Sequence, residues 1–139
     1  MIITLEKGEL SVEEQSIVSD GFSRTAEASD APNYNKLPLK WLATNNNTLS
    51  GVLTTALLWD WLYIDELWVD EKVRQCGLGR NLMNTSERYA TYKKLSGIWL
   101  WTQSWQAVGF YAKLGYEEFA RFPNFPQGHE RVGFRKMFN

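Results

Sequence analysis

Hydrophobic residues along the chain follow two spacings, one typical of strands and one typical of helices. Short runs rich in apolar and β-branched residues, bounded by glycine, proline or asparagine, predict strands. Apolar residues that recur every three or four positions predict helices, and the Ser-x-x-Glu pattern at Ser11 and Glu14 marks where the first helix begins. These patterns predict strands at residues 2–5, 39–44, 49–58, 61–69, 97–102, 117–122 and 131–137, and helices from residue 11, over 78–94 and over 107–114.

The order of these elements predicts a mixed sheet. The strands between residues 39 and 69 follow one another with short turns, which favours an antiparallel meander. Residues 61–102 read strand, helix, strand, and this connection requires one parallel pair. Residues 27–37 are small and polar and contain proline, which predicts a loop. We expect one domain over residues 1–139, built from both helices and strands.

Size, charge and composition restrict the class of protein. A chain of 139 residues is the size of one domain and can bury roughly two thirds of its unfolded surface. The formal net charge of −1, without a long run of one sign, argues against nucleic acid or a membrane surface as partner. The single cysteine, Cys76, cannot form an internal disulfide, no apolar run nears the roughly 20 residues that cross a bilayer, and no leader pattern opens the sequence. We therefore expect a cytoplasmic protein.

A glycine loop between a strand and a helix is the strongest local feature of the sequence. Gly77 and Gly79 remove side chains where backbone N–H groups converge, and a helix start of this kind binds phosphate groups. The loop is not a P-loop, because Gly79 is followed by Arg80 and Asn81 instead of lysine and then serine or threonine. Nor is it a dinucleotide fingerprint, because Leu82 stands at the place of the third glycine.

Two separated motifs give the sequence a resemblance to a known family. Residues 74–79, Arg-Gln-Cys-Gly-Leu-Gly, match the Arg/Gln-x-x-Gly-x-Gly/Ala signature of the GNAT acyltransferases. Residues 104–116, SWQAVGFYAKLGY, are similar to the Asn-x-x-Ala-x-x-Phe-Tyr-x-Lys-x-Gly-Phe/Tyr segment that closes the cofactor site in that family. An acidic strand before the glycine loop agrees with both. The resemblance implies a GNAT-like α+β fold, with a central, mostly antiparallel sheet of six to seven strands and about four flanking helices.

The resemblance also implies acetyl-coenzyme A as co-substrate, with no metal. In the family the backbone of the glycine loop holds the pyrophosphate, and the preceding strand pairs with the pantetheine arm. The family's asparagine at the start of the second motif is replaced here by Ser104, whose side chain has a shorter reach. The cofactor-binding residues expected on this basis are Leu67, Trp68, Val69, Arg74, Gln75, Cys76, Gly77, Leu78, Gly79, Arg80, Ser104 and Tyr111.

Two residues are expected to carry the chemistry that the resemblance implies. Tyr111 stands at the position of the family's tyrosine, and a phenol, which ionises near pH 10, can donate a proton to the departing thiolate. Glu66, or Asp65 as its alternative, would take a proton from the acceptor ammonium, directly or through water. Because side chains alternate along a strand, we expect only one of the two to face the site. Acyl-cysteine chemistry on Cys76 is disfavoured, because His129, the one histidine, lies in a distant loop.

The sequence thus predicts an N-acetyltransferase that acts by direct transfer on a primary amine of a small molecule or a peptide. A catalytically inactive acyl-coenzyme A-binding domain, which senses the cofactor or mediates assembly, is the alternative. An acetylating toxin aimed at charged transfer RNA would need a basic face, which the near-neutral charge argues against. Seven tryptophans favour packing across strands and, with exposed strand edges, a homodimer. In the family the first helix and the loop after it line the acceptor pocket, and here these segments carry no motif.

Overall fold

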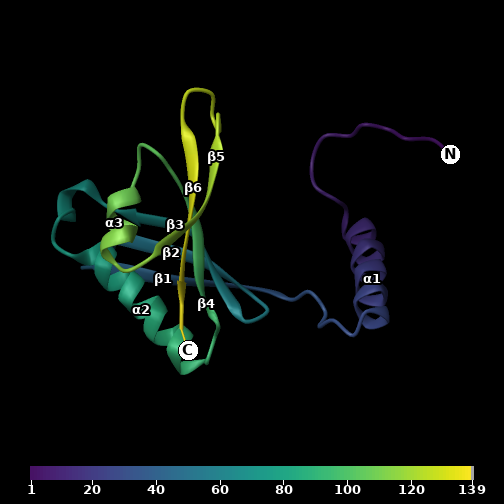
Figure 1. Ribbon diagram of the computed structural model, residues 1–139, viewed down its shortest axis with the longest axis horizontal. Coiled ribbons are helices and arrows are strands. Elements are labelled where there is room, and N and C mark those ends of the chain that lie inside the picture. The colour runs from purple at the N-terminus through teal and green to yellow at the C-terminus, as the bar shows by residue number, and fades with distance from the viewer. Residues whose placement is uncertain (139) are drawn as a thin grey trace. The chain divides into compact units, whose positions relative to one another are not determined.

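The computed structural model describes residues 1–138. Contacts among the residues divide the chain into two compact units, Met1–Asn35 and a second unit that begins at Lys36. The first unit holds one helix, and the second holds the whole sheet with the other helices (Figure 1).

Helix α1, Val12–Ala28, begins where the sequence predicts. The Ser11 hydroxyl accepts a hydrogen bond from the backbone N–H of Glu14, at 3.1 Å, and the Glu14 carboxylate accepts one from the backbone N–H of Ser11, at 2.8 Å. This reciprocal pair satisfies two N–H groups that a helix start leaves without partners. The capping pattern alone therefore located the first turn correctly.

The strand predicted at residues 2–5 is wrong, because these residues form no strand. Ile2 and Ile3 are 89% and 92% exposed. A strand is stable only when a neighbour pairs with it, and an apolar run cannot supply that partner by itself. Within this unit the predicted apolar face of α1 is likewise uncovered, with Phe22 68% exposed.

The second unit is a six-stranded mixed sheet with the strand order β1-β2-β3-β4-β6-β5. All neighbouring pairs are antiparallel except β3 and β4, so the single parallel pairing that the sequence predicts is confirmed. The mixed α and β fold class is confirmed as well, with three α-helices in the described residues where about four were expected. The strands are β1 (Lys36–Asn45), β2 (Thr48–Leu58), β3 (Trp61–Val69), β4 (Gly97–Gln103), β5 (Glu117–Pro123) and β6 (Glu130–Met137).

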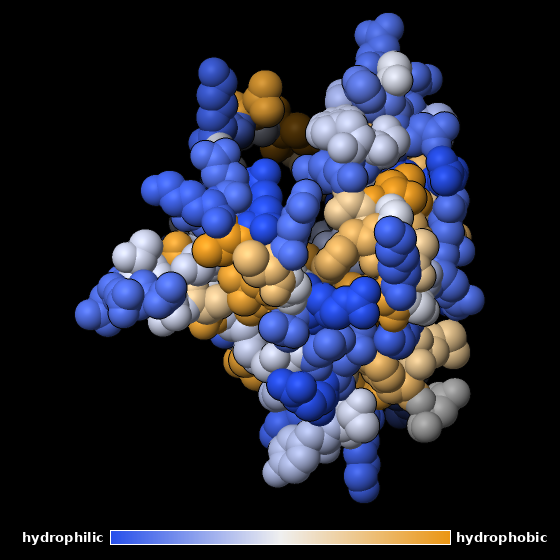
Figure 2. Space-filling model, turned by 90° about the vertical axis from the view of Figure 1, so that its left-hand side faces the viewer, coloured by the Kyte–Doolittle hydropathy of each residue, from blue (hydrophilic) through white to orange (hydrophobic). Residues whose placement is uncertain are grey.

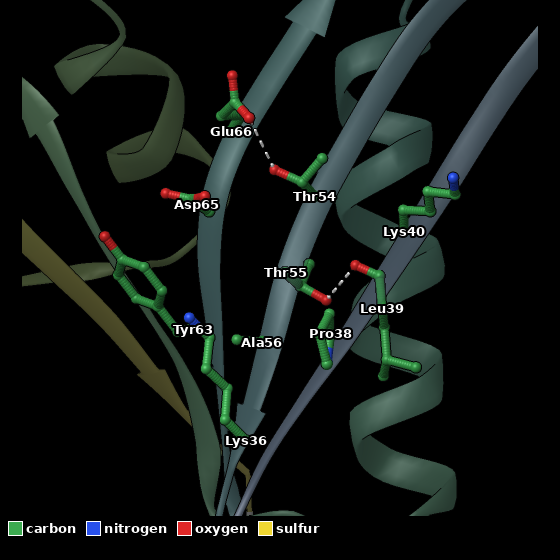
Figure 3. Close-up of a pocket in the computed structure, with 10 residues that line it drawn as sticks. All are labelled: Lys36, Pro38, Leu39, Lys40, Thr54, Thr55, Ala56, Tyr63, Asp65 and Glu66. Carbon is green, nitrogen blue, oxygen red and sulfur yellow. Dashed lines mark hydrogen bonds between the residues drawn. The ribbon is translucent and has the colours of Figure 1, made fainter. Parts of the chain in front are cut away.

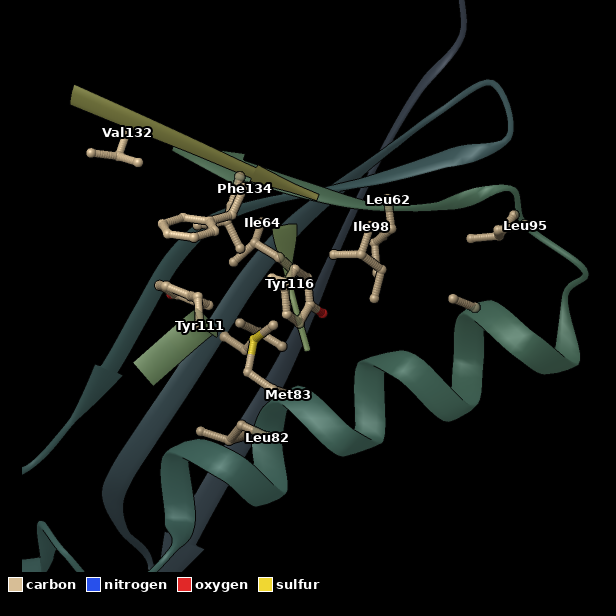
Figure 4. Close-up of a cluster of buried hydrophobic side chains, with 13 residues drawn as sticks. Leu62, Ile64, Leu82, Met83, Leu95, Ile98, Tyr111, Tyr116, Val132 and Phe134 are labelled. Atoms are coloured by element: carbon tan, nitrogen blue, oxygen red, sulfur yellow. The ribbon is translucent and has the colours of Figure 1, made fainter. Parts of the chain in front are cut away.

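Helices α2 (Leu78–Tyr92) and α3 (Val108–Lys113) enclose the hydrophobic core against one face of the sheet (Figure 4). The 3-10 helix η1 (Glu71–Val73) leads from β3 toward α2. On the side that carries α2 and α3, hydrophobic side chains still reach the surface between hydrophilic ones (Figure 2). No helix in residues 1–138 is long and apolar enough to span a membrane. The buried hydrophobic cluster comprises Leu53, Leu62, Ile64, Leu82, Met83, Ala90, Leu95, Ile98, Leu100, Tyr111, Tyr116, Val132 and Phe134.

Aromatic rings cross the other face of the sheet from strand to strand. The rings of Tyr63 and Trp99 lie 4.6 Å apart, and those of Trp101 and Phe119 lie 5.4 Å apart. Gly133 makes room for this row, because a Cβ atom there would lie 2.7 Å from the Phe119 ring. Trp99 and Trp101 therefore pack across strands, as the sequence predicts, whereas Trp41 packs on Tyr89 of α2, and none of the seven tryptophans is fully buried.

A partly buried polar cluster ties α2 to the end of the sheet. The Glu87 carboxylate accepts hydrogen bonds from the Tyr116 hydroxyl, at 3.1 Å, and from the Lys136 ammonium, at 3.2 Å. We expect Glu87→Ala to lower the free energy of unfolding by about 1–3 kcal/mol, because it leaves the Tyr116 hydroxyl without an acceptor and takes the carboxylate from the Lys136 ammonium, which keeps its bond to the Leu114 carbonyl. Glu117→Ala, which removes an exposed pair with Arg135, should cost under about 1 kcal/mol. Urea unfolding of both variants measures the difference, and equal losses would contradict it.

Candidate active site

The sheet opens between β3 and β4. Their parallel pairing runs only from Trp61 with Gly97 to Ile64 with Leu100, although each strand continues beyond the last pair. Past this point the edge of β3 that faces β4 is free of β4. The sheet therefore contains a gap at the carboxyl ends of its two central strands.

Main-chain groups of the predicted cofactor strand point into this gap. The N–H of Asp70 donates to the carbonyl of Ser50 in β2, at 2.9 Å. Because successive residues of a strand direct their main-chain groups to opposite edges, Leu67 and Val69 direct theirs away from β2. The carbonyl of Val69 is already engaged, since Nε of Arg74 donates to it at 3.0 Å. The N–H of Val69 and both groups of Leu67 lie at the free edge, where the sequence placed them.

The glycine loop carries α2 to the same end of the sheet. Gly77 caps the helix in the left-handed region, with φ of 80°, and Gln75 also has a positive φ, of 63°. The first helical hydrogen bond runs from the N–H of Asn81 to the carbonyl of Gly77, at 2.9 Å. The N–H groups of Leu78, Gly79 and Arg80 thus have no helical acceptor, and the cap supplies no side chain for them.

The space beside Gly77, at the cap of the helix, is open. A Cβ atom built on Gly77 would meet no heavy atom within 4 Å. Free N–H groups, the positive end of the helix dipole and open space are what a diphosphate requires. The start of α2 therefore has the features of an anion site made of backbone N–H groups, with the Arg74 side chain turned back onto the strand.

Helix α3 places Tyr111 beside this loop. The Phe110 ring lies 3.6 Å from where a Cβ of Gly79 would stand, so α3 packs on the first turn of α2. Tyr111 is 6% exposed, and burial raises the pKa of its phenol to about 12. The group therefore keeps its proton at neutral pH and can act only as a donor.

The Tyr111 hydroxyl is not engaged by the protein. It makes no hydrogen bond to any of residues 1–138. Every side-chain oxygen in that range that is fully buried does have a hydrogen-bond partner, so the Tyr111 oxygen is not among the fully buried ones. Its oxygen must therefore reach a surface that solvent can touch. Its neighbour Tyr116 differs, because the hydroxyl of Tyr116 is bonded to Glu87, and burial together with that carboxylate raises its pKa. Of these two core tyrosines, Tyr111 is the one available for chemistry.

The expectation that only one of Asp65 and Glu66 faces the site is wrong. Thr54 pairs with Glu66, whereas Thr55 pairs with Ile64, so Asp65 is an extra residue in β3. This β-bulge interrupts the alternation of side chains and turns both carboxylates to the face opposite α2. The burial of side chains along β3 shows this interruption, because the side chains that face the core are residues 62 and 64 before the bulge and residues 67 and 69 after it. No sequence pattern marked the bulge.

Both carboxylates line a pocket of about 560 Å³ on that face (Figure 3). The floor comes from β2, where the Thr54 hydroxyl donates to Oε1 of Glu66 at 3.4 Å. Several of the residues that line the pocket were not identified from the sequence, because only the pairing of β1, β2 and β3 brings them together. The lining residues are Lys36, Pro38, Leu39, Lys40, Thr54, Thr55, Ala56, Tyr63, Asp65 and Glu66.

The remaining predicted residues have less direct positions. The Ser104 hydroxyl accepts from the N–H of Glu130 at 3.1 Å, and its own N–H donates to the Glu130 carbonyl at 2.8 Å, so Ser104 joins the end of β4 to β6. Trp68 is 44% exposed, and Cys76 is exposed in the glycine loop. His129 packs against Trp105, with ring centres 4.8 Å apart. The role of Ser104 toward a cofactor stays a prediction.

The arrangement of strand gap, glycine loop and tyrosine agrees with comparisons to known proteins. A model of the acetyltransferase (GNAT) family matches residues 11–116. The chain belongs to the GNAT acetyltransferase family. The match extends over parts of both units, and the expectation of one domain over residues 1–139 stays a prediction.

Individual GNAT relatives include enzymes named for antibiotics. The blasticidin-S acetyltransferase of Streptomyces morookaense is 36% identical over 97 residues, which are 66% of this chain and 71% of that protein. An acetyltransferase from Bacillus cereus has a crystal structure with a TM-score of 0.80, 28% identity and coverage of 98% of both chains. A Bacillus anthracis protein assigned to the streptothricin acetyltransferases, bound to acetyl coenzyme A, shares the fold with a TM-score of 0.66 at 23% identity, over 73% of this chain and 63% of that one.

Proposed function

We propose that this GNAT protein is an acetyl-coenzyme A-dependent N-acetyltransferase that transfers acetyl directly to a primary amine of a small molecule. Three features support the proposal: the free edge of β3, the unpaired N–H groups at the start of α2, and the unengaged phenol of Tyr111 on α3, the helix whose Phe110 ring packs near Gly79 in the first turn of α2. An inactive acyl-coenzyme A sensor is the second candidate. It would need the loop and the free edge, but it would not need a buried tyrosine whose hydroxyl has no protein partner.

Two sets of main-chain groups bind different parts of acetyl-coenzyme A. The N–H groups of Leu78 to Arg80 bind the diphosphate, and the free main-chain groups of Leu67 and Val69 pair with the amides of the pantetheine arm. Acetyl-coenzyme A supplies an activated thioester at the inner end of that arm. A backbone N–H donor at the thioester oxygen can contribute roughly a hundredfold in rate, and the N–H of Val69 or Leu67 takes that role.

Proton transfer uses groups on the two sides of the gap. The acceptor enters the pocket as an ammonium ion, and Glu66 or Asp65 removes a proton so that the nitrogen lone pair can attack. The bond from nitrogen to the acetyl carbon forms as the carbon–sulfur bond breaks. Tyr111 gives its proton to the departing sulfur, and a free thiol leaves. The nitrogen, which still carries one proton too many for an amide, releases it as the carbon–sulfur bond breaks, and this second proton restores the Tyr111 phenol, so the net proton released is the one taken up by the carboxylate. Acidic side chains in the pocket favour a cationic amine as acceptor.

The proposal is tested by measuring free thiol release from acetyl-coenzyme A. The panel of acceptors includes polyamines, amino acids, aminoglycosides, nucleoside antibiotics and short peptides, with mass spectrometry of the acetylated product. Thiol release that depends on an amine supports the proposal. If acetyl-coenzyme A binds in calorimetry and no amine is acetylated, the sensor candidate replaces it.

Both carboxylates of the bulge are expected to contribute to the removal of the proton. We expect Glu66→Gln to lower kcat/KM at pH 7 by about 10- to 100-fold, and Asp65→Asn to lower it less, because Glu66 is held by Thr54. The difference should shrink as pH rises and more of the acceptor amine is already neutral. Initial rates from pH 6 to 10 measure this. Loss of rate that is independent of pH would contradict the role as a base.

A further inference from the structure

The pocket beside Glu66 has charges of opposite sign on two sides. Lys36 and Lys40 come from β1, and Asp65 and Glu66 come from β3. None of these four side chains forms an ion pair with any of residues 1–138, so the positive and negative groups do not neutralise one another. The proposed reaction uses the acidic side and leaves the lysines without a role.

The strand register sets the distance between the two sides. Lys40 pairs with Thr54, and Thr54 pairs with Glu66, so the three residues stand on one line across three strands. Neighbouring strands lie about 4.8 Å apart, which separates the backbones of the outer two by about 10 Å. In Figure 3 the Lys36 side chain runs along the pocket floor toward the side of Asp65 and Tyr63, whereas Lys40 points away from the acidic side. Lys36 is therefore the cation better placed to meet a molecule in the pocket.

An edge strand such as β1 often carries lysines that only prevent pairing with other chains. Two observations favour a binding role in this case. Both lysines line a cavity, together with the carboxylates that attract the amine. A purely cationic acceptor would also be repelled by them, whereas one with an acidic group at its far end would be held at both ends.

We infer that the acceptor is a zwitterion, an amine with a carboxylate or comparable acidic group several bonds away, and that Lys36, supported by Lys40, binds the acidic group. This inference rests on the proposed function, since it names the substrate class of the same site. Lys36 pairs with Leu58, four residues along β2 from Thr54, so its backbone stands about 13 Å along the strands and about 10 Å across them from that of Glu66. Extended toward each other, the two side chains cover about 10 Å of that distance, so the separation of amine and acid in the acceptor should be about 5–8 Å. Amino acids with a terminal amine and a chain of five or six carbons have this length.

The experiment compares three acceptors of equal length: 6-aminohexanoate, its amide and 1,6-diaminohexane. We expect kcat/KM for the acid to exceed that for the amide by about 10-fold at low salt, and the diamine to be the poorest. The preference should shrink in 0.5 M NaCl, because all four charged side chains are exposed and their interactions are screened. Lys36→Met should bring the ratio of acid to amide close to one, and Lys36→Arg should retain it.

Lys93→Met, at the end of α2, is the matched control and should leave the ratio at its wild-type value. An amide acetylated as well as the acid, or a ratio that persists in the Lys36→Met, Lys40→Met double variant, overturns the inference while leaving the proposed function intact. If no amine is acetylated, the proposed function fails. In that case the inference is tested separately, by calorimetry that compares the affinities of 6-aminohexanoate and its amide for the coenzyme A-bound protein. Tighter binding of the acid supports the inference, and equal affinities overturn it.

Discussion

Tyr111→Phe is expected to lower kcat by about 100-fold or more, while the dissociation constant of acetyl-coenzyme A changes less than about threefold. Removing the hydroxyl leaves the ring, which packs against Phe110, Tyr116 and Phe134. The core therefore keeps its shape, and the departing sulfur loses its proton donor. Stopped-flow thiol detection gives kcat, and calorimetry gives the dissociation constant.

The neighbouring tyrosine provides a matched control. Tyr116→Phe removes the hydroxyl of a similarly buried residue, but one that donates to Glu87. This variant should lose about 1–2 kcal/mol of stability and keep kcat within about threefold. If both variants lose kcat equally, the effect comes from packing of the core and not from proton donation.

The raised pKa of Tyr111 also predicts how kcat depends on pH. A phenol with a pKa of about 12 stays protonated throughout the range from pH 6 to pH 10. Tyr111 should therefore produce no fall in kcat on the alkaline side of that range. A wild-type rate that falls between pH 8 and pH 10, with the fall absent from Tyr111→Phe, would show that the phenol ionises there and would contradict the donor role.

Gly77→Val is expected to weaken acetyl-coenzyme A binding by about 100-fold or more. Gly77 has φ of 80°, a conformation that costs a β-branched residue about 1–3 kcal/mol. The new side chain would also occupy open space at the cap of α2, where the ligand is proposed to bind. Both effects act on the loop that holds the diphosphate, and calorimetry with acetyl-coenzyme A and with coenzyme A measures the loss.

Gly128→Val separates backbone strain from ligand binding. Gly128 has φ of 83° and no neighbour within 4 Å of an added Cβ, but it lies in the turn between β5 and β6. The two variants should lose similar melting temperature, and only Gly77→Val should lose affinity. Wild-type affinity in Gly77→Val would remove the glycine loop from the cofactor site.

The sequence predicted those parts of the fold that local patterns determine. The predicted strand at 61–69 has the bounds of β3, and the Ser11 capping pattern located the start of α1. Asn46 and Asn47, in the turn between β1 and β2, adopt positive φ, which asparagine tolerates better than most residues. In these cases a few neighbouring residues decide the conformation, so a single sequence contains the information.

The errors and omissions concern features that depend on distant residues. Residues 2–5 have the composition of a strand, but composition cannot supply a pairing partner. The bulge at Asp65 is a mismatch between β2 and β3, and neither strand shows it alone. The lysines of the pocket and the free hydroxyl of Tyr111 emerge only once β1 pairs with β2 and α3 packs on α2. The motifs identified the cofactor side of the site, whereas the acceptor side required the tertiary structure.

The short parallel pairing of β3 with β4 also bears on how the sheet moves. The meander β1–β3 and the group β4, β6 and β5 are joined along the sheet only through the pairs from Trp61 with Gly97 to Ile64 with Leu100. A ligand in the gap whose amides pair with the strands as a peptide does would extend this short connection between the two groups of strands. The two halves of the sheet would then twist as one body, and departure of the thiol product would loosen them again.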